Sequence, residues 1–224
     1  MTVAAKIKIA LLLPLLAGLC ACEMNTNGGS ADSVPTEQSG APAALSAPIL
    51  QNVAVGKTTL EQAKERYPDL QRFNGGYMRF GNRMLAGDSG AIEVYQREIR
   101  GHAAQQSLVF DGDSKVLQML VLLRADNDVA AFARDLEEIG FAPYPRLTEQ
   151  EFAILNSGMF STAEERQKAV DETGTRQFKR GDLFAFVVPA EANGGMAGLT
   201  IMNLAYEPEH RAKWRQQQAA QQRQ

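Results

Sequence analysis

The side chains with the greatest capacity for chemistry in this chain are two cysteines near its N-terminus and two histidines. Cys20 and Cys22 end an apolar run, whereas His102 stands beside a predicted strand and His210 lies in a polar C-terminal segment. The sequence contains no Gly-x-Ser-x-Gly, His-Glu-x-x-His or Gly-x-Gly-x-x-Gly motif that would give either histidine a catalytic setting. We therefore expect no catalytic, cofactor-binding or metal site, and we place the predicted chemistry at the cysteines.

The apolar run, residues 9–19, follows the basic residues Lys6 and Lys8. Its length suits the core of a secretory signal peptide, which has roughly 7–15 apolar residues. A helix that crosses a bilayer needs about 20 apolar residues, and polar sequence begins here just after Cys22. Residues 1–21 are therefore predicted to be a cleaved signal peptide rather than a transmembrane helix.

The residues around the cleavage point distinguish two kinds of signal. Cleavage before Cys22 puts Ala21 at position −1 and Leu19 at position −3. Ordinary signal peptidase prefers small residues at both positions, so Leu19 suits it poorly. Leu at −3, a small residue at −1 and then Cys resemble the lipobox of bacterial lipoproteins, and Cys20 is the poorer candidate because Leu19 directly precedes it. A plain secreted chain and an uncleaved anchor remain the alternatives.

This resemblance implies a lipid modification at Cys22, with a diacylglycerol on its sulfur and an acyl chain such as palmitate on its nitrogen. One acyl chain holds a protein only marginally, whereas two or more give stable anchoring. The residue after Cys22 is Glu23, not the Asp that favours retention in the inner membrane. The resemblance therefore implies an outer-membrane lipoprotein, and we expect it to face the periplasm.

Composition excludes several classes of function. The chain has 23 Lys and Arg against 26 Asp and Glu, and removal of Lys6 and Lys8 with the signal leaves 21 against 26, a formal charge of −5. A nucleic-acid binder would normally carry a strongly basic face. Only Cys22 survives processing, so the mature chain cannot form an internal disulfide. Nucleotide binding is also not expected, because Gly56-Lys57-Thr58 lacks the first Gly of a phosphate-binding loop.

Composition also divides the mature chain into three segments. Residues 23–48 are rich in Asn, Gly, Ser, Ala, Pro and Gln, and such a segment buries too little apolar surface to fold. We expect it to be a disordered linker between the lipid on Cys22 and a domain at 49–206. Residues 207–224 form a polar, Gln-rich tail with a single tryptophan, Trp214. The tail is predicted to be a solvated helix, with a membrane-surface or partner contact through Trp214 as the alternative.

Hydrophobic periodicity and capping signals predict the elements of the domain. Thr58 and Glu61 have capping-box spacing, as do Thr148 and Glu151, and Ser161 and Glu164. The predicted helices are 58–67, 127–139, 149–156 and 162–171. The predicted strands are a short one at 77–80, then 92–100, 105–110, 116–123, 175–179, 183–188 and 199–206.

This order of elements predicts an α+β fold. Strands joined by short loops pair antiparallel, and the apolar face of the sheet needs helices packed on it. We therefore expect an antiparallel sheet with helices packed on one face. A helix followed by three strands occurs twice, at 49–124 and 125–206, so two alternatives stay open: tandem repeats from an internal duplication, or one domain whose halves merely look alike.

Two stretches of the first half resemble a known family. Residues 55–63 (VGKTTLEQA) resemble the opening of small outer-membrane lipoproteins of the β-barrel-assembly accessory family, and residues 108–116 (LVFDGDSKV) resemble the late hairpin of that family. The helix-then-three-strand unit is similar to the one repeated in β-lactamase-inhibitor proteins. The resemblance implies a protein-binding module without an active site, and it identifies no partner.

Two functions follow as hypotheses. The first is a non-catalytic protein-interaction module, lipid-anchored at the outer membrane, with an envelope protein as its partner. The alternative is a hydrolase of envelope polymers that uses carboxylates brought together by the fold. The adjacent pairs Glu137-Glu138 and Glu164-Glu165 do not serve, because neighbouring helix residues do not converge on one substrate. We therefore expect the chain not to be an enzyme.

The lipid anchor gives a direct prediction. Replacement of Cys22 by Ala removes the acylated side chain, so the variant is expected either to keep its signal peptide and run larger than the wild type, or to appear as a soluble species outside the membrane fraction. Cell fractionation with immunoblotting measures this, and Cys20→Ala is the matched control. A Cys22→Ala product that stays in the membrane fraction at the wild-type size would refute lipidation there.

Overall fold

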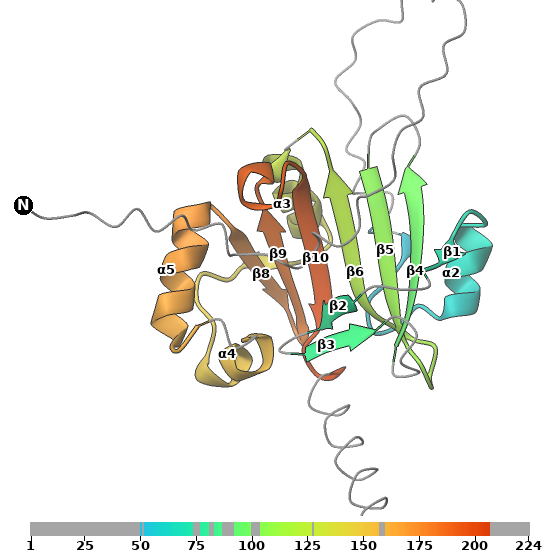
Figure 1. The fold of residues 1–224 in the computed structure, drawn as a ribbon, viewed down its shortest axis with the longest axis horizontal. Coiled ribbons are helices and arrows are strands. Elements are labelled where there is room, and N and C mark those ends of the chain that lie inside the picture. The colour runs from blue at the N-terminus through green and yellow to red at the C-terminus, as the bar shows by residue number, and fades with distance from the viewer. Residues whose placement is uncertain are drawn as a thin grey trace, which may run out of the picture.

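A computed structural model gives the fold of the domain (Figure 1). It describes Leu50 and residues 52–73, 77–80, 83–86, 92–99, 104–126, 128–156 and 160–206. The signal peptide, Cys22, the linker, His102 and the tail with Trp214 lie outside these residues.

The domain contains four helices and ten strands among the described residues. The helices are α2 (Leu60–Arg66), α3 (Val129–Glu138), α4 (Glu149–Leu155) and α5 (Ala163–Thr173), with a 3₁₀ turn η1 (Ala190–Ala192). The strands are β1 (Gln71–Arg72), β2 (Tyr77–Phe80), β3 (Arg83–Ala86), β4 (Ile92–Ile99), β5 (Ala104–Asp111), β6 (Leu117–Arg124), β7 (Ala142–Pro143), β8 (Arg176–Arg180), β9 (Leu183–Val188) and β10 (Ala197–Asn203). The predicted helices and strands are confirmed within a few residues at their ends, whereas β3 and the two-residue strands β1 and β7 were not predicted.

Eight strands form one open antiparallel sheet in the order β1-β4-β5-β6-β10-β9-β8-β7, and β2 and β3 form a separate hairpin. The order reads the same from either end: a short edge strand, then three strands joined in sequence, with β6 and β10 side by side at the centre. The predicted α+β class with an antiparallel sheet is confirmed, and the helix-then-three-strand unit occurs in both halves.

The two halves differ in what they insert between the edge strand and the next strand. The first half carries the β2–β3 hairpin between β1 and β4, and the second half carries α4 and α5 between β7 and β8. Figure 1 shows α4 and α5 beside β8 at one end of the sheet and α2 beside β4 at the other.

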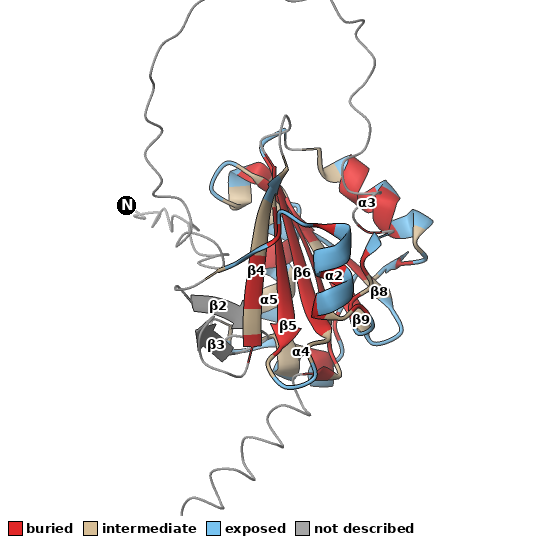
Figure 2. Cartoon of the chain, turned by 90° about the vertical axis from the view of Figure 1, so that its right-hand side faces the viewer, coloured by how far each residue is buried: buried red, intermediate tan, exposed pale blue. Residues whose placement is uncertain are grey.

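Helices cover both faces of the sheet, so the expectation of helices on one face needs extending. The first core contains Leu60 of α2 and Phe132 of α3, packed on one face of the sheet. The second core lies on the opposite face, where Phe152 of α4 packs. Figure 2 shows the result, with β5 and β6 buried along most of their length. The reason is visible in β6, whose sequence is an almost continuous apolar run rather than an alternation, as in a strand buried on both sides.

At two of the three predicted capping boxes the N-cap is displaced by one residue. Thr59 rather than Thr58 caps α2, through reciprocal bonds with Gln62. The hydroxyl of Thr58 is instead buried and accepts the N–H of Ala54 at 2.8 Å. At α5 the cap is Thr162, not Ser161, because the Thr162 hydroxyl accepts the N–H of Glu165.

The third capping box, Thr148 with Glu151, is confirmed. It also makes contacts beyond the start of its helix. The Glu151 carboxylate accepts hydrogen bonds from the backbone N–H and hydroxyl of Thr148, from the hydroxyl of Tyr144 and from the ammonium of Lys179 on β8. Burial alone would raise the pKa of Glu151, but these four donors outweigh it and hold the pKa down at about 2. The carboxylate thereby fastens α4 to the sheet.

This arrangement predicts an acid-sensitive contribution to stability. The folded pKa of Glu151, about 2, lies below its usual value of 4.5, so the ionised form stabilises the fold above about pH 4.5 and this contribution is lost as the pH falls toward 2. At about 1.36 kcal/mol per pKa unit, Glu151→Gln is expected to lower the free energy of unfolding at pH 7 by about 3 kcal/mol. Urea unfolding from pH 7 to pH 2 measures it.

Glu149→Gln is the matched control, because Glu149 is exposed in the same first turn. A Glu151→Gln deficit that stays constant down to pH 2, or that equals the deficit of the control, would contradict this account of the carboxylate.

Candidate functional site

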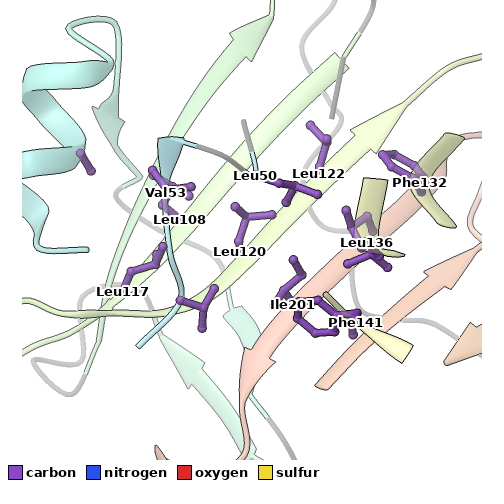
Figure 3. Packing of buried hydrophobic residues seen from close by; sticks show 14 of the residues in the cluster. Leu50, Val53, Leu108, Leu117, Leu120, Leu122, Phe132, Leu136, Phe141 and Ile201 are labelled. Atoms are coloured by element: carbon purple, nitrogen blue, oxygen red, sulfur yellow. The ribbon is translucent and has the colours of Figure 1, made fainter. Parts of the chain in front are cut away.

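The chain enters the domain through a segment that lies between the two helices of the first core. We call residues 50–55 the strap; of these, Gln51 is not described. The side chains of Leu50, Val53 and Val55 are buried in the first core. Figure 3 shows Leu50 and Val53 over β5 and β6, beside Leu108 and Leu122. The strap thus covers part of the sheet that α2 and α3 leave open.

Polar contacts fix the strap at several points. The guanidinium of Arg66 donates to the carbonyl of Asn52, and the N–H of Gly56 donates to the carbonyl of Leu117 at 2.6 Å. Gly56 has a φ of +80°, a conformation that L side chains rarely adopt. Gly56 and Thr58, which stand out in the family-like opening of this domain, therefore have physical roles here: one turns the chain and the other caps the turn.

A groove of about 460 Å³ lies beside the strap, on the first-core face of the sheet. One wall is the strap, and the other is the chain that follows α3, including Ile139 and Phe141. The floor is formed by Leu120 of β6, Ile201 of β10 and Leu183 of β9. Residues of both halves therefore line the groove, and Glu138 and Arg180 are the charged side chains among the described residues of its lining.

The two charges at the groove differ in how they are held. Arg180 places its guanidinium 4.9 Å from the centre of the Phe141 ring and donates to the carbonyl of Ile139, at the C-terminal end of α3. The hydrogen bond satisfies a carbonyl at the end of the helix, and the positive charge of the guanidinium suits the negative end of the helix dipole. Glu138 is exposed and takes part in none of the ion pairs seen among the described residues. The rim therefore offers one fixed cation and one carboxylate open to a partner.

A buried ionic cluster fixes the N-terminal end of α3. Arg124, the last residue of β6, is almost fully buried; its guanidinium binds the carboxylate of Asp126 and lies 5.5 Å from the centre of the Phe132 ring. Burial raises the pKa of Asp126, but the bonds from Arg124 outweigh it and leave that pKa below its usual value. Burial, aided by Glu138, raises the pKa of Asp135, which Arg124 partly opposes. The cluster ties α3 to the sheet.

Of the carboxylate pairs considered in the sequence, Glu164-Glu165 has local structural partners, and the side chains of Glu137-Glu138 have none among the hydrogen bonds and ion pairs of the described residues. Glu164 forms an ion pair with Arg146 at 2.7 Å, and Glu165 accepts the N–H of Ser161. Glu137 and Glu138 are both exposed at the end of α3 and line different hollows. Cys22, the one predicted modification site, His102 and His210 lie outside the described residues.

Sequence reasoning placed the start of the domain at residue 49 but missed the strap. The signal was present: Leu50, Val53 and Val55 are closely spaced apolar residues directly after a linker that has few. The groove itself had no sequence signal, because its lining comes from six segments that only the sheet order brings together.

In the described part of the chain, no helix is long and apolar enough to cross a membrane, and no three His, Cys, Asp or Glu side chains are grouped to hold a metal ion. No protein-family model, no curated protein and no solved structure matches this chain. The lipoprotein and β-barrel-assembly accessory resemblances therefore stay predictions.

The strap yields a prediction about stability. Gly56→Ala forces a Cβ into the left-handed region and is expected to lower the free energy of unfolding by about 1–2 kcal/mol. Gly112→Ala, at a glycine of the β5–β6 loop without a positive φ, is the control and should change it by less than about 0.5 kcal/mol. Urea unfolding compares the two. Equal effects would show that the strap does not depend on the turn at Gly56.

Proposed function

We propose that this protein is an outer-membrane lipoprotein, lipid-anchored through Cys22, whose domain is a non-catalytic protein-interaction module. The observation that carries the proposal is the apolar groove between the strap and the end of α3. Its volume, about 460 Å³, falls within the roughly 300–1,000 Å³ usual for binding sites. Apolar surface that is exposed in one contiguous place marks interaction sites.

The lining of the groove indicates the kind of partner. A floor of Leu120, Ile201 and Leu183 offers apolar contact, so it suits one or two apolar side chains of a partner segment. Each such side chain, if fully buried, would contribute about 1.5–3 kcal/mol. Glu138 at the rim suits a basic residue next to those apolar ones. The partner proposed is therefore an envelope protein that presents an apolar segment flanked by a positive charge.

The proposed tether complements this groove. Residues 23–48 would reach about 90 Å if fully extended, at 3.3–3.6 Å per residue, and roughly 30 Å as a coil. The strap is the direct continuation of that linker, so a partner in the groove would contact the anchored end of the domain. A lipid at Cys22 would keep the domain near the membrane while the linker lets it search for its partner.

The hydrolase alternative has less support. Among the described residues, one hollow is lined by Asp69 and Glu98, but Asp69 is ion-paired with Arg97 at 3.1 Å. Another is lined by Glu137 and Asp171, and Asp171 accepts a hydrogen bond from Gln167. Glycoside hydrolysis by general acid–base catalysis needs two carboxylates that both reach the scissile bond. We therefore propose the interaction module alone.

Site-specific photo-crosslinking tests the groove. A photoreactive amino acid at Leu183, in the groove, is expected to give one recurring adduct in intact cells, since a bound partner segment would lie against it. The matched position is Lys168, exposed on the outer side of α5. Adding Leu183→Glu to a chain that carries the crosslinker at Ile139 should abolish that adduct, because a charge would be buried against apolar surface.

Two results would refute this use of the groove. One is the same adduct from Leu183 and Lys168, and the other is an adduct at Ile139 that survives Leu183→Glu. If the protein is membrane-bound in cells and no adduct forms at any groove position, the interaction function is refuted while the anchor is not.

A further inference from the structure

A second hollow lies at the other end of the sheet, away from the groove. It has a volume of about 380 Å³ and opens at the edge formed by β1 and β4. Its lining includes three glutamines, Gln71, Gln96 and Gln105, together with Phe73 and Glu98. We call it the glutamine cleft.

Strand register brings these side chains together. Gln71 of β1 stands opposite Gln96 of β4, and Gln105 of β5 stands opposite Glu98 of β4. Side chains two residues apart on a strand share a face, so Gln96 and Glu98 are neighbours on β4 and Phe73 follows Gln71. Directly opposed residues have Cβ atoms about 4.5–5.5 Å apart. Residues far apart in the chain therefore form one continuous polar surface.

The charges around the cleft are already paired, apart from Glu98, which forms none of the ion pairs seen among the described residues. Arg97 binds Asp69 at 3.1 Å, and Glu93 lies 2.9 Å from Lys115 and 3.8 Å from Arg72. These pairs leave the cleft without a strong net field, so it suits neither a phosphate nor a metal ion.

The amides, by contrast, are not engaged. The side chains of Gln71, Gln96 and Gln105 make none of the hydrogen bonds seen within the described structure, and the Nε2 atom of Gln96 is buried without a partner. A buried amide donor without an acceptor costs about 1–3 kcal/mol, and native structures leave few such groups unsatisfied. The orphan donor thus points to an acceptor supplied by a ligand in the cleft.

The chemistry of the lining identifies the class of that ligand. A primary amide has two donors and an acceptor oxygen, and a hydroxyl group also donates and accepts. The lining also holds Asp69, Arg72, Arg97 and Glu98, of which the first three are in ion pairs. The three neutral amides are left to match a neutral molecule that carries several hydroxyl groups. Phe73 is partly exposed and offers a ring on which the C–H face of a sugar can lie. A peptide strand would offer its backbone groups to β4 instead and would leave the three amides without partners.

We propose that the glutamine cleft binds a neutral saccharide chain, with Gln71, Gln96 and Gln105 donating to and accepting from its hydroxyl or acetamido groups. The site is independent of the groove. A domain with both would hold a glycan at the edge of the sheet and a protein between its halves.

Titration of the mature chain with defined saccharides tests this. The probes are a tetramer of N-acetylglucosamine and maltotetraose, which differ in their acetamido groups. NMR of the glutamine side-chain amides is expected to show saturable shifts at Gln71, Gln96 and Gln105 with at least one probe. Binding of only the acetylated probe would support the proposal and assign an acetamido contact.

Gln71→Leu and Gln96→Leu should each raise the Kd about tenfold, the effect of one or two lost hydrogen bonds.

Gln150→Leu, at an exposed glutamine of α4, is the control and should leave the Kd unchanged. Because Gln71 is exposed on a two-residue strand, Gln71→Leu is expected to fold even if Gln96→Leu does not. Failure of both probes to shift the three amides would overturn the proposal, as would a Kd unaffected by Gln71→Leu. The photo-crosslinking at the groove is unaffected by either result, so the two proposals fail separately.

Discussion

The pairing of β6 with β10 is the constraint on which the rest of this structure depends. It runs from Ala197 opposite Arg124 to Met202 opposite Met119, and it joins two four-stranded halves into one sheet. Both strands are buried on both faces, so this junction is the centre of the two cores at once. The groove exists because the junction sets α2 and α3 on the same face and leaves between them a gap that the strap only partly covers.

The sequence could predict the local elements because their signals are local. Gly140 after the apolar stripe of α3, and the capping pair Thr148 and Glu151, each act within one turn of chain. It could not predict which strands meet, because β6 and β10 are separated by about half of the domain and their pairing has no short-range signal. The continuous apolar run of β6 is a local signal of a strand buried on both faces, whereas the order of elements predicts only that an apolar face needs helices.

The candidate sites also divide into those with a local signal in the sequence and those without one. Cys22 was predictable because a lipobox is a contiguous pattern, and it remains a prediction. The strap was within reach of the sequence, since Leu50, Val53 and Val55 interrupt a polar composition. The groove and the glutamine cleft were not, because register alone sets Gln71 opposite Gln96 and sheet order alone sets Leu120 beside Ile201. Physically, the strap links the proposed anchor to the groove, so membrane attachment and partner binding would meet at one place.

Hydrogen exchange tests the central claim most directly, which is that the groove beside the strap is where a partner binds. The comparison is between the mature chain in native envelope membranes and the purified chain in detergent, followed by mass spectrometry. The account predicts added protection in envelope membranes at residues 52–58 and 139–141, with no change in α5. Equal exchange in the two states at those residues, or protection confined to α5, would contradict it.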